Sequence, residues 1–371
     1  MVGKEIEMRK VLPDYNRCLV NLSQSILKHF GVETSANTLP EVDAMLEKGY
    51  RNVVVLLLDG MGVETMERIL DKDGPFRRNL KLSYSSVFPP TTVAATTSLL
   101  SGKMPSSHGW LGWDNYYPEL DRNVTVFLNR IQGTDIPAAP YHVADTFTPY
   151  KNILELIEEK GGKAYGASPF LPPNPKSLEE ILDRIRTLCS TREKKFIYGY
   201  WGEPDATLHQ EGGGSEKVRE TMRDIERKVY ETVSSLEDTL FLITADHGHL
   251  DNRTAILQDY EDIMSLLLRL PSIEPRSLNF FVKEGKKEEF KAAFLSHFSE
   301  DFDLYTKEEV IEMKLFGEGE EHPRFRDMLG DFLAVARSDL SIYYTKNIWA
   351  SMHAGYTESE MIIPLISFER N

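Results

Sequence analysis

The run VVVLLL at residues 53–58, followed by DGMG at residues 59–62, determines the class of fold. Six consecutive aliphatic side chains without polar alternation are typical of a strand buried on both faces, as strands of parallel sheets are. Similar apolar runs occur at FIYGY (196–200), LFLIT (240–244) and residues 361–366. They alternate with long charged segments of helical periodicity at 177–189 and 216–236. The pattern predicts an α/β fold in which helices cover both faces of a parallel sheet.

The segment between residues 256 and 340 differs from the rest of the chain. It is rich in Glu, Lys and Gly, and it mixes short apolar runs with a charged stretch at 286–297. A chain of 371 residues is long enough for one large domain or two smaller ones. We therefore expect residues 1–255 and 341–371 to form the core, and residues 256–340 to form an inserted α+β cap subdomain.

The charge of the chain limits its partners. The sequence has 43 basic and 58 acidic side chains, a net charge of −15 at pH 7. Such a surface repels the phosphates of nucleic acid polymers, so we expect no DNA or RNA partner. A small anionic substrate remains compatible with this charge, because bound metal ions invert the field locally.

The cellular compartment is also suggested by composition. Residues 1–10 lack the apolar stretch of a signal peptide, and no apolar run is long enough to span a membrane. The two cysteines, Cys18 and Cys189, lie far apart and predict free thiols. We therefore expect a cytoplasmic protein without a membrane partner. Nothing in the sequence specifies the oligomeric state.

Side chains that bind metals follow three of the predicted strands at the point where each strand ends. They are Asp59, Asp205 with His209, and Asp246 with His247, and His353 precedes the last strand. The carboxyl ends of parallel strands meet at one edge of a sheet, so these groups are expected to lie together. Taken singly, an Asp at a strand end is usually a helix cap or a turn residue. Together, three carboxylates and three imidazoles suit two zinc ions, with manganese as an alternative.

A nucleophile is predicted in the segment VFPPTTVAATTSLLSG at residues 87–102. The two prolines exclude a helix before Thr91, and the Ala, Thr and Leu residues that follow predict a helix from Thr92 to a C-cap at Gly102. The free N–H groups at such a helix start bind anions. A plain N-cap is the commoner role for a threonine here. The local pattern does not choose between Thr91 and Thr92.

Five segments in this order resemble the alkaline phosphatase superfamily, and its nucleotide pyrophosphatase/phosphodiesterase branch in particular. They are LLLDGMG, FPPTTVAATTSLLSGKMPSSHG, EPDATLH, TADHGH and MHAGYT, which together span residues 56–357. The resemblance implies a three-layer α/β/α catalytic core with a mostly parallel central sheet. The segment 256–340 is not covered by these motifs.

The resemblance also implies a role for each residue. One zinc ion is expected at Asp205, His209 and His353, and a second at Asp59, Asp246 and His247 beside Thr92. Thr92 is favoured over Thr91 because it lies ten residues before Gly102 of the Ser-Gly pair, as in the family. The implied mechanism is attack of the Thr92 alkoxide on phosphorus, which forms a phospho-threonine that water then hydrolyses. A metal activates such a weak nucleophile and stabilises the charge of the displacement.

One position departs from the family pattern. The diesterase branch has an asparagine four residues after the Gly of its His-Gly pair, where it contacts a phosphate oxygen. In this chain the pair is His108-Gly109, the fourth residue onward is Trp113, and Asn115 lies two positions further. We expect Trp113 and Asn115 to contact substrate, although an aromatic loop at this place can also be simple packing. His249 matches no ligand position of the family and is expected either to contact the ligands from outside or to be a bystander, the second being favoured.

The sequence thus predicts a metal-dependent hydrolase that cleaves phosphodiester or pyrophosphate bonds of small, nucleotide-like phosphate esters. One alternative is a phosphomonoesterase, phosphonate hydrolase or phosphomutase of the same superfamily, which Trp113 keeps open. Another alternative is a non-catalytic binding protein that is stabilised by metal. The intact set of ligands and nucleophile argues against it.

Overall fold

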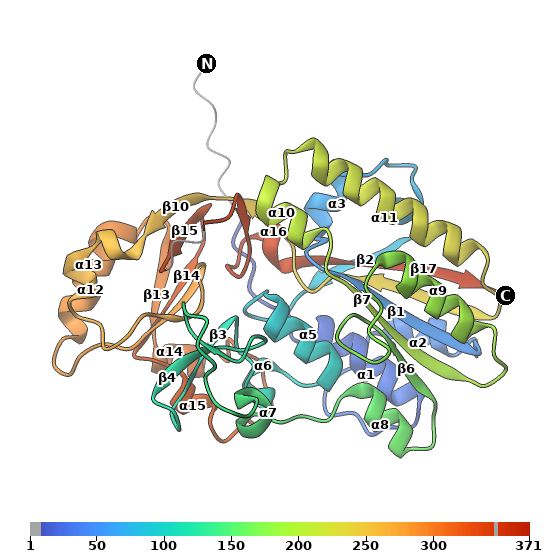
Figure 1. Ribbon diagram of the computed structural model, residues 1–371, viewed down its shortest axis with the longest axis horizontal. Helices are drawn as coiled ribbons and strands as arrows, with labels where there is room; N and C mark the ends of the chain where they lie inside the picture. Colours follow the sequence, from blue (N-terminus) through green and yellow to red (C-terminus); the bar gives the residue numbers. More distant parts are fainter. Residues whose placement is uncertain (1–8, 345–347) are drawn as a thin grey trace.

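The computed structural model describes residues 9–344 and 348–371, which form two large sheets with their covering helices and two short two-stranded sheets (Figure 1). The core sheet has six strands in the order β2-β17-β8-β1-β7-β6. Its strands are β1 (Asn52–Leu58), β2 (Leu80–Ser85), β6 (Ala164–Ala167), β7 (Lys195–Trp201), β8 (Thr239–Thr244) and β17 (Ile362–Arg370). β1 pairs in parallel with β7 and β8, and β6 in parallel with β7, whereas β17 is antiparallel to its neighbours. The prediction of a mostly parallel sheet is confirmed.

Helices cover both faces of the core sheet (Figure 1). One layer contains α1 (Leu19–His29), α2 (Pro40–Leu46), α5 (Thr92–Ser101) and α8 (Ile153–Glu159). The other contains α3 (Val63–Ile69), α4 (Pro75–Arg78), α9 (Leu178–Cys189), α10 (Asp205–Glu211), α11 (Glu216–Ser234) and α16 (Glu358–Met361). The apolar residues of α11 recur at helical spacing and are buried against the sheet, from Val218 to Val233. The three-layer α/β/α core is therefore confirmed.

The central strands of the core sheet are completely buried. Every residue of β1 and of β8 is buried, as the unbroken apolar runs predict. Cys18 and Cys189 are buried free thiols, also as expected. Within the residues that the structure describes, no helix is both long and apolar enough to cross a membrane. Residues 1–8, part of the segment predicted to lack a signal peptide, lie outside the described residues.

A second sheet of seven strands lies beside the core and is entirely antiparallel (Figure 1). In sheet order its strands are β13 (Phe302–Thr306), β14 (Phe332–Ala336), β12 (Ser277–Phe280), β11 (Ser272–Glu274), β3 (Asp114–Tyr117), β4 (Arg122–Thr125) and β5 (Arg130–Ile131). Its helices are α6 (Pro105–His108), α7 (Val143–Phe147), α12 (Glu261–Met264), α13 (Lys287–Phe298), α14 (Lys307–Glu312) and α15 (Phe325–Met328). Three strands thus come from residues 114–131, which precede the segment 256–340. The domain boundary proposed at 256–340 stays a prediction.

Short strands connect the second sheet to the core. β10 (Arg253–Ile256) pairs in parallel with β15 (Leu340–Tyr343), and β9 (Leu250–Asp251) pairs antiparallel with β16 (Ser351–Met352). A single turn of 3-10 helix, η1 (Leu257–Asp259), follows β10. The β9–β16 pair places the loop that contains His353 beside the loop after β8, at the carboxyl edge of the core sheet.

Candidate active site

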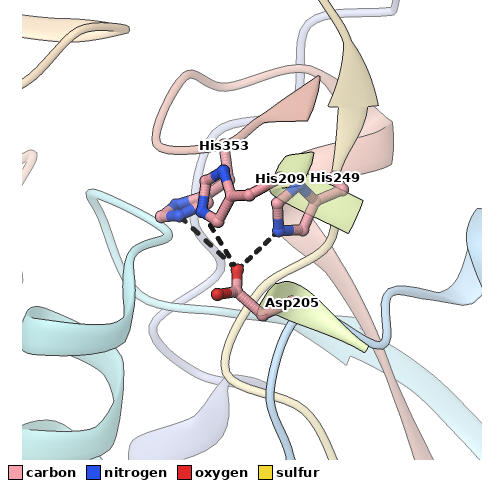
Figure 2. A group of neighbouring side chains, drawn as sticks. All are labelled: Asp205, His209, His249 and His353. Atoms are coloured by element: carbon pink, nitrogen blue, oxygen red, sulfur yellow. Dashed lines mark hydrogen bonds and ion pairs between the residues drawn. The ribbon is translucent and has the colours of Figure 1, made fainter. Parts of the chain in front are cut away.

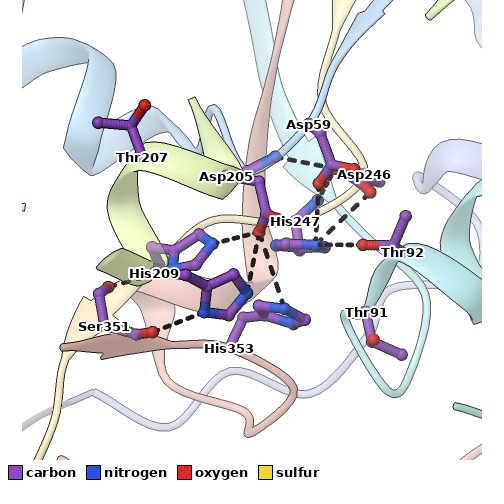
Figure 3. A network of polar contacts seen from close by, with 12 residues as sticks. Asp59, Thr91, Thr92, Asp205, Thr207, His209, Asp246, His247, Ser351 and His353 are labelled. Carbon is purple, nitrogen blue, oxygen red and sulfur yellow. Dashed lines mark hydrogen bonds and ion pairs between the residues drawn. The ribbon is translucent and has the colours of Figure 1, made fainter. Parts of the chain in front are cut away.

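The candidate site lies where β1, β7 and β8 end, as the sheet topology requires (Figure 3). Asp59 directly follows β1, and its backbone N–H donates to Trp201 O of β7 (3.0 Å). Asp205 begins α10, and its N–H donates to Asp59 O (3.0 Å). Asp246 follows β8, and its Oδ1 accepts from Gly60 N (3.1 Å). Adjacent strands therefore bring the three predicted carboxylates to one place.

The loop that contains His353 is held by a buried ion pair. The guanidinium of Arg276, in the turn between β11 and β12, donates to both carboxylate oxygens of Glu360 in α16 (2.6 and 2.9 Å). Both side chains are fully buried. Glu360 also accepts from Gly355 N (2.7 Å) and from the Thr357 hydroxyl (2.7 Å). The second sheet thereby fixes the backbone that presents His353 to the core.

Three predicted imidazoles are oriented by backbone carbonyl groups. Each Nδ1 contacts a carbonyl oxygen: His209 with Ser351 (2.8 Å), His353 with Pro90 (3.1 Å) and His247 with Gly248 (3.1 Å). A carbonyl oxygen only accepts hydrogen bonds, so each Nδ1 carries a proton and donates. The Nε2 atoms are left to face the carboxylates. Histidines that ligate metals are oriented in this way, with the second nitrogen donating outward.

The donor atoms form two adjoining groups. His247 Nε2 lies 3.3 Å from Asp59 Oδ1, 3.5 Å from Asp246 Oδ2 and 3.2 Å from Thr92 Oγ1. In the second group, Asp205 Oδ1 lies 3.3 Å from His209 Nε2 and 3.9 Å from His353 Nε2. Asp59, Asp205 and His247 also lie within metal-binding reach of one another, so Asp205 stands between the two groups. All seven predicted catalytic and metal-binding residues are therefore brought together.

The electrostatics of the first group fit a bound cation. Within the described residues, Asp59 Oδ1 and Asp246 Oδ2 are buried oxygens that accept no hydrogen bond. Burial and the charge of Asp59 raise the pKa of Asp246 well above its usual value. Burial opposes the charged form of His247, but the carboxylates of Asp246 and Asp59 raise its pKa to about 10. Both raised pKa values mean that, without a metal, the group holds protons where a cation could bind, and its mixed oxygen and nitrogen donors suit a divalent metal.

The two adjacent threonines have different environments. Thr91 is the N-cap of α5, and its hydroxyl donates to Glu274 Oε1 (2.6 Å) of the second sheet. Thr92 is the first residue of α5, and its hydroxyl faces His247. The predicted C-cap at Gly102 is confirmed, with a φ of +66°. Only Thr92 presents its oxygen to the metal-binding group, at the helix start where N–H groups are free.

Trp113 directly precedes β3 and Asn115 lies within it, away from the contacts between the aspartates, the histidines and Thr92. The indole of Trp113 is 40% exposed and packs edge-to-face on Phe127. Asn115 is buried, and its Nδ2 donates to Gly109 O (3.2 Å). Among the described residues, no hydrogen bond links either side chain to the aspartate and histidine groups. Their predicted contact with substrate stays a prediction.

Two residues at the site are not identified by the sequence reasoning. Glu274 is buried, accepts from Thr91 and from Trp113 N (3.0 Å), and burial raises its pKa to about 7. No motif points to it, because it lies in a β-strand of the second sheet. His249, expected to be a bystander, lies with its Nε2 2.6 Å from Asp205 Oδ1. Its position two residues after His247 is the signal that could have found it.

The fold and the clustered aspartates and histidines define a member of the alkaline phosphatase superfamily. A family model described as type I phosphodiesterase / nucleotide pyrophosphatase matches residues 53–356, so the chain belongs to this family. The resemblance stated from the motifs is confirmed. The family is one of metal-dependent hydrolytic enzymes, and this chain is a hydrolase of that type. No curated protein sequence matches the chain.

Solved structures show the same fold at low sequence identity. Murine ectonucleotide pyrophosphatase/phosphodiesterase 5 is 20% identical, with a TM-score of 0.64 over 84% of this chain and 87% of that one. The human protein of the same name is 18% identical, with a TM-score of 0.66 over 85% and 87%. Phosphonoacetate hydrolase from Sinorhizobium meliloti is 15% identical, with a TM-score of 0.63 over 86% and 90%.

Proposed function

We propose that this chain is a two-metal phosphohydrolase that cleaves phosphodiester or pyrophosphate bonds in nucleotide-like substrates. The observation that carries the proposal is the position of Thr92. Thr92 is the first residue of α5, and its hydroxyl oxygen lies 3.2 Å from His247 Nε2, the same nitrogen that faces the buried oxygens of Asp59 and Asp246. This is the arrangement of a nucleophile with metal ligands around it.

The ligands divide between two zinc ions, with manganese as an alternative. Asp205, His209 and His353 would hold one ion, and Asp59, Asp246, His247 and Thr92 would hold the other. When bound, the ions lower the pKa of the Thr92 hydroxyl and neutralise charge on the phosphate. The three aspartates and a Thr92 alkoxide supply four negative charges, which balance the four positive charges of two divalent metal ions. An anionic substrate can therefore approach despite the net charge of −15.

The chain's own residues perform a two-step displacement. The Thr92 oxygen attacks phosphorus, a P–O bond to Thr92 forms, and the P–O bond to the leaving group breaks. The free N–H groups at the start of α5 would stabilise the charge of a phosphate bound beside Thr92. Water then attacks the phospho-threonine, which releases the phosphate product and returns the Thr92 hydroxyl.

A solved relative supports the role of the threonine. One structure of murine ectonucleotide pyrophosphatase/phosphodiesterase 5 is described as an inactive threonine-to-alanine variant in complex with AMP. For that protein, loss of one threonine abolishes activity while a nucleotide remains bound. By analogy we assign the nucleophile to Thr92 and the substrate class to nucleotide-like phosphate esters.

A second candidate function is hydrolysis of phosphomonoesters or phosphonates. The observation that favours it is Trp113, which stands where the diesterase branch has its phosphate-binding asparagine. The similarity in fold to phosphonoacetate hydrolase is compatible with it. Parallel assays with bis-p-nitrophenyl phosphate, p-nitrophenyl phosphate and a phosphonate distinguish the two candidates by which substrate turns over.

The test combines metal analysis with turnover. We expect about two metals per chain, and hydrolysis of bis-p-nitrophenyl phosphate that a chelator abolishes. Thr92→Ala should lower turnover by on the order of 1000-fold or more while both metals stay bound. Thr96→Ala, which removes a hydroxyl that donates to a backbone carbonyl of its own helix, is the matched control and should keep turnover. Near-normal turnover by Thr92→Ala would refute the assignment of Thr92 as the nucleophile. Bound metal in wild type without turnover of any phosphate ester would indicate a binding protein.

A further inference from the structure

We propose that Glu274 is a positioning residue for the nucleophile and acts on it through Thr91. The inference rests on the proposed function, in which Thr92 attacks phosphorus, and it concerns a side chain outside the two metal-binding groups. Glu274 is the last residue of β11 in the second sheet and is buried. The imidazoles around Asp205 turn toward its carboxylate (Figure 2). Within the described residues, no hydrogen bond or ion pair joins Glu274 to them.

Thr91 does not use its hydroxyl in the usual way of a helix N-cap. A threonine at this position normally accepts a hydrogen bond from an N–H group in the first turn of the helix. Thr91 has the extended backbone of an N-cap, with φ −142° and ψ 149°, but in the described part of the chain its side chain caps no N–H group of α5. Its hydroxyl donates instead to Glu274 Oε1 (2.6 Å), 183 residues away in sequence. The N–H groups of the first turn are therefore left available for an anion.

The same carboxylate oxygen also holds the loop before β3. The backbone N–H of Trp113 donates to Glu274 Oε1 (3.0 Å). Trp113 stands where the diesterase branch has its phosphate-binding asparagine. Gly112 permits the close approach of this loop to β11, because a Cβ there would lie 2.7 Å from Ile273 Cγ2 and 2.9 Å from its Cα. One oxygen of Glu274 thus fixes both the start of α5 and the loop at the asparagine position.

The backbone that presents Glu274 is strained. Ile273, the residue directly before it, has a φ of +78°. A β-branched residue with a positive φ is a genuine outlier, and such strain costs on the order of 1–3 kcal/mol. Neighbouring strands on both sides hold Ile273 in place, since it pairs with Leu278 of β12 and with Asp114 of β3. Strain that is enforced by neighbours is typical of functional placement, and here it precedes the side chain that reaches α5.

The contact has two consequences for the proposed reaction. While Glu274 holds the Thr91 hydroxyl, the backbone that leads into Thr92 is fixed to the second sheet. Without Glu274, the Thr91 hydroxyl would be free to cap its own helix and would occupy N–H groups that a phosphate needs. Thr92 would then shift, and a misplacement of about 1 Å lowers a rate by about 100-fold. Glu274 therefore orients the nucleophile and keeps the start of α5 open for an anion.

Two substitutions of Glu274 distinguish positioning from proton transfer. Leucine has a similar size but accepts no hydrogen bond, so Glu274→Leu should lower kcat for bis-p-nitrophenyl phosphate by about 100-fold while the metal content stays unchanged. Glutamine keeps an oxygen that accepts from Thr91 and from Trp113 N, so Glu274→Gln should rescue most of this loss. A glutamine variant as slow as the leucine variant would overturn the positioning role, because both lack an acid or base. A leucine variant with the kcat of wild type would overturn it as well.

A double-mutant cycle tests the route through Thr91. Thr91→Val should lower kcat to a similar extent as Glu274→Leu, and the double variant should be no slower than either single variant, because the two side chains act as one unit. Losses that multiply in the double variant would overturn this route. The matched control is Thr125→Val, which removes another buried hydroxyl that donates to a carboxylate, Asp114 Oδ1 (2.6 Å), and should keep turnover.

Crystal structures provide a readout that does not depend on turnover. Wild type and Glu274→Leu, both loaded with zinc, are compared under the same conditions. In the variant, Thr92 Oγ1 should shift by about 1 Å relative to His247, and the Thr91 hydroxyl should accept from an N–H group of α5. An unmoved Thr92 would overturn the inference. Wild type that hydrolyses no phosphate ester would refute only the proposed function, since the shift of Thr92 still tests the role of Glu274.

Discussion

The buried carboxyl group of Glu274 should make the stability of the protein depend on pH. Burial raises its pKa from 4.5 to about 7, despite hydrogen bonds from Thr91 and Trp113 that favour the charged form. A folded pKa above the unfolded one means that the native state binds more protons between these values. The free energy of unfolding therefore falls as pH rises from 4.5 to about 7. At about 1.36 kcal/mol per pH unit, the full effect is about 3 kcal/mol.

Glu274→Gln removes this titration and keeps the shape of the side chain. At pH 5, where the native carboxyl is protonated, the variant and wild type should differ little in the free energy of unfolding by urea. At pH 8 the variant should gain about 3 kcal/mol relative to wild type, because it no longer holds a buried charge. The exposed Glu312→Gln is the matched control for loss of one carboxyl group. A difference between variant and wild type that stays constant from pH 5 to 8 would refute the reasoning.

Two further predictions concern buried polar groups. Burial lowers the pKa of His108 to about 3, so only the unfolded state takes up a proton as the pH falls below 6.5, and the free energy of unfolding decreases. His108→Gln should remove about 2 kcal/mol of this decrease between pH 6.5 and pH 5, measured by unfolding in urea. Acid sensitivity unchanged by the substitution would contradict this. Glu360→Ala leaves the Arg276 guanidinium buried without its partner, and thermal or urea unfolding should show a loss of about 3–5 kcal/mol. A loss below about 1 kcal/mol would mean that water reaches Arg276.

The core and most of the candidate site follow from local sequence patterns. The run at 53–58 predicts a buried strand without knowledge of its neighbours, because the absence of polar alternation is a property of the strand itself. Once the strands are placed, Asp59 and Asp246 must lie at the same sheet edge. The start of α5 was predictable for a similar reason, since Pro89 and Pro90 exclude a helix before Thr91.

The remaining features depend on contacts between distant segments. β3 and β11 join the two halves of the second sheet through one pair, Asp114 with Ile273, and neither segment shows this pairing in its own composition. The different environments of the two threonines depend on Glu274, which comes from that sheet. The orientation of His249 depends on Ser351, about one hundred residues further along the chain. Periodicity and spacing carry no information about such contacts.

Because β17 lies between β2 and β8, the order of synthesis determines when the core sheet can close. Until residues 362–370 have been made, β2 and β8 each have an open edge of unpaired backbone groups. Such edges are templates for pairing with other chains. The nascent protein therefore exposes the unpaired edges of β2 and β8 when almost all of its other core residues have already been synthesised. Insertion of β17 is the late folding step that protects the chain from aggregation.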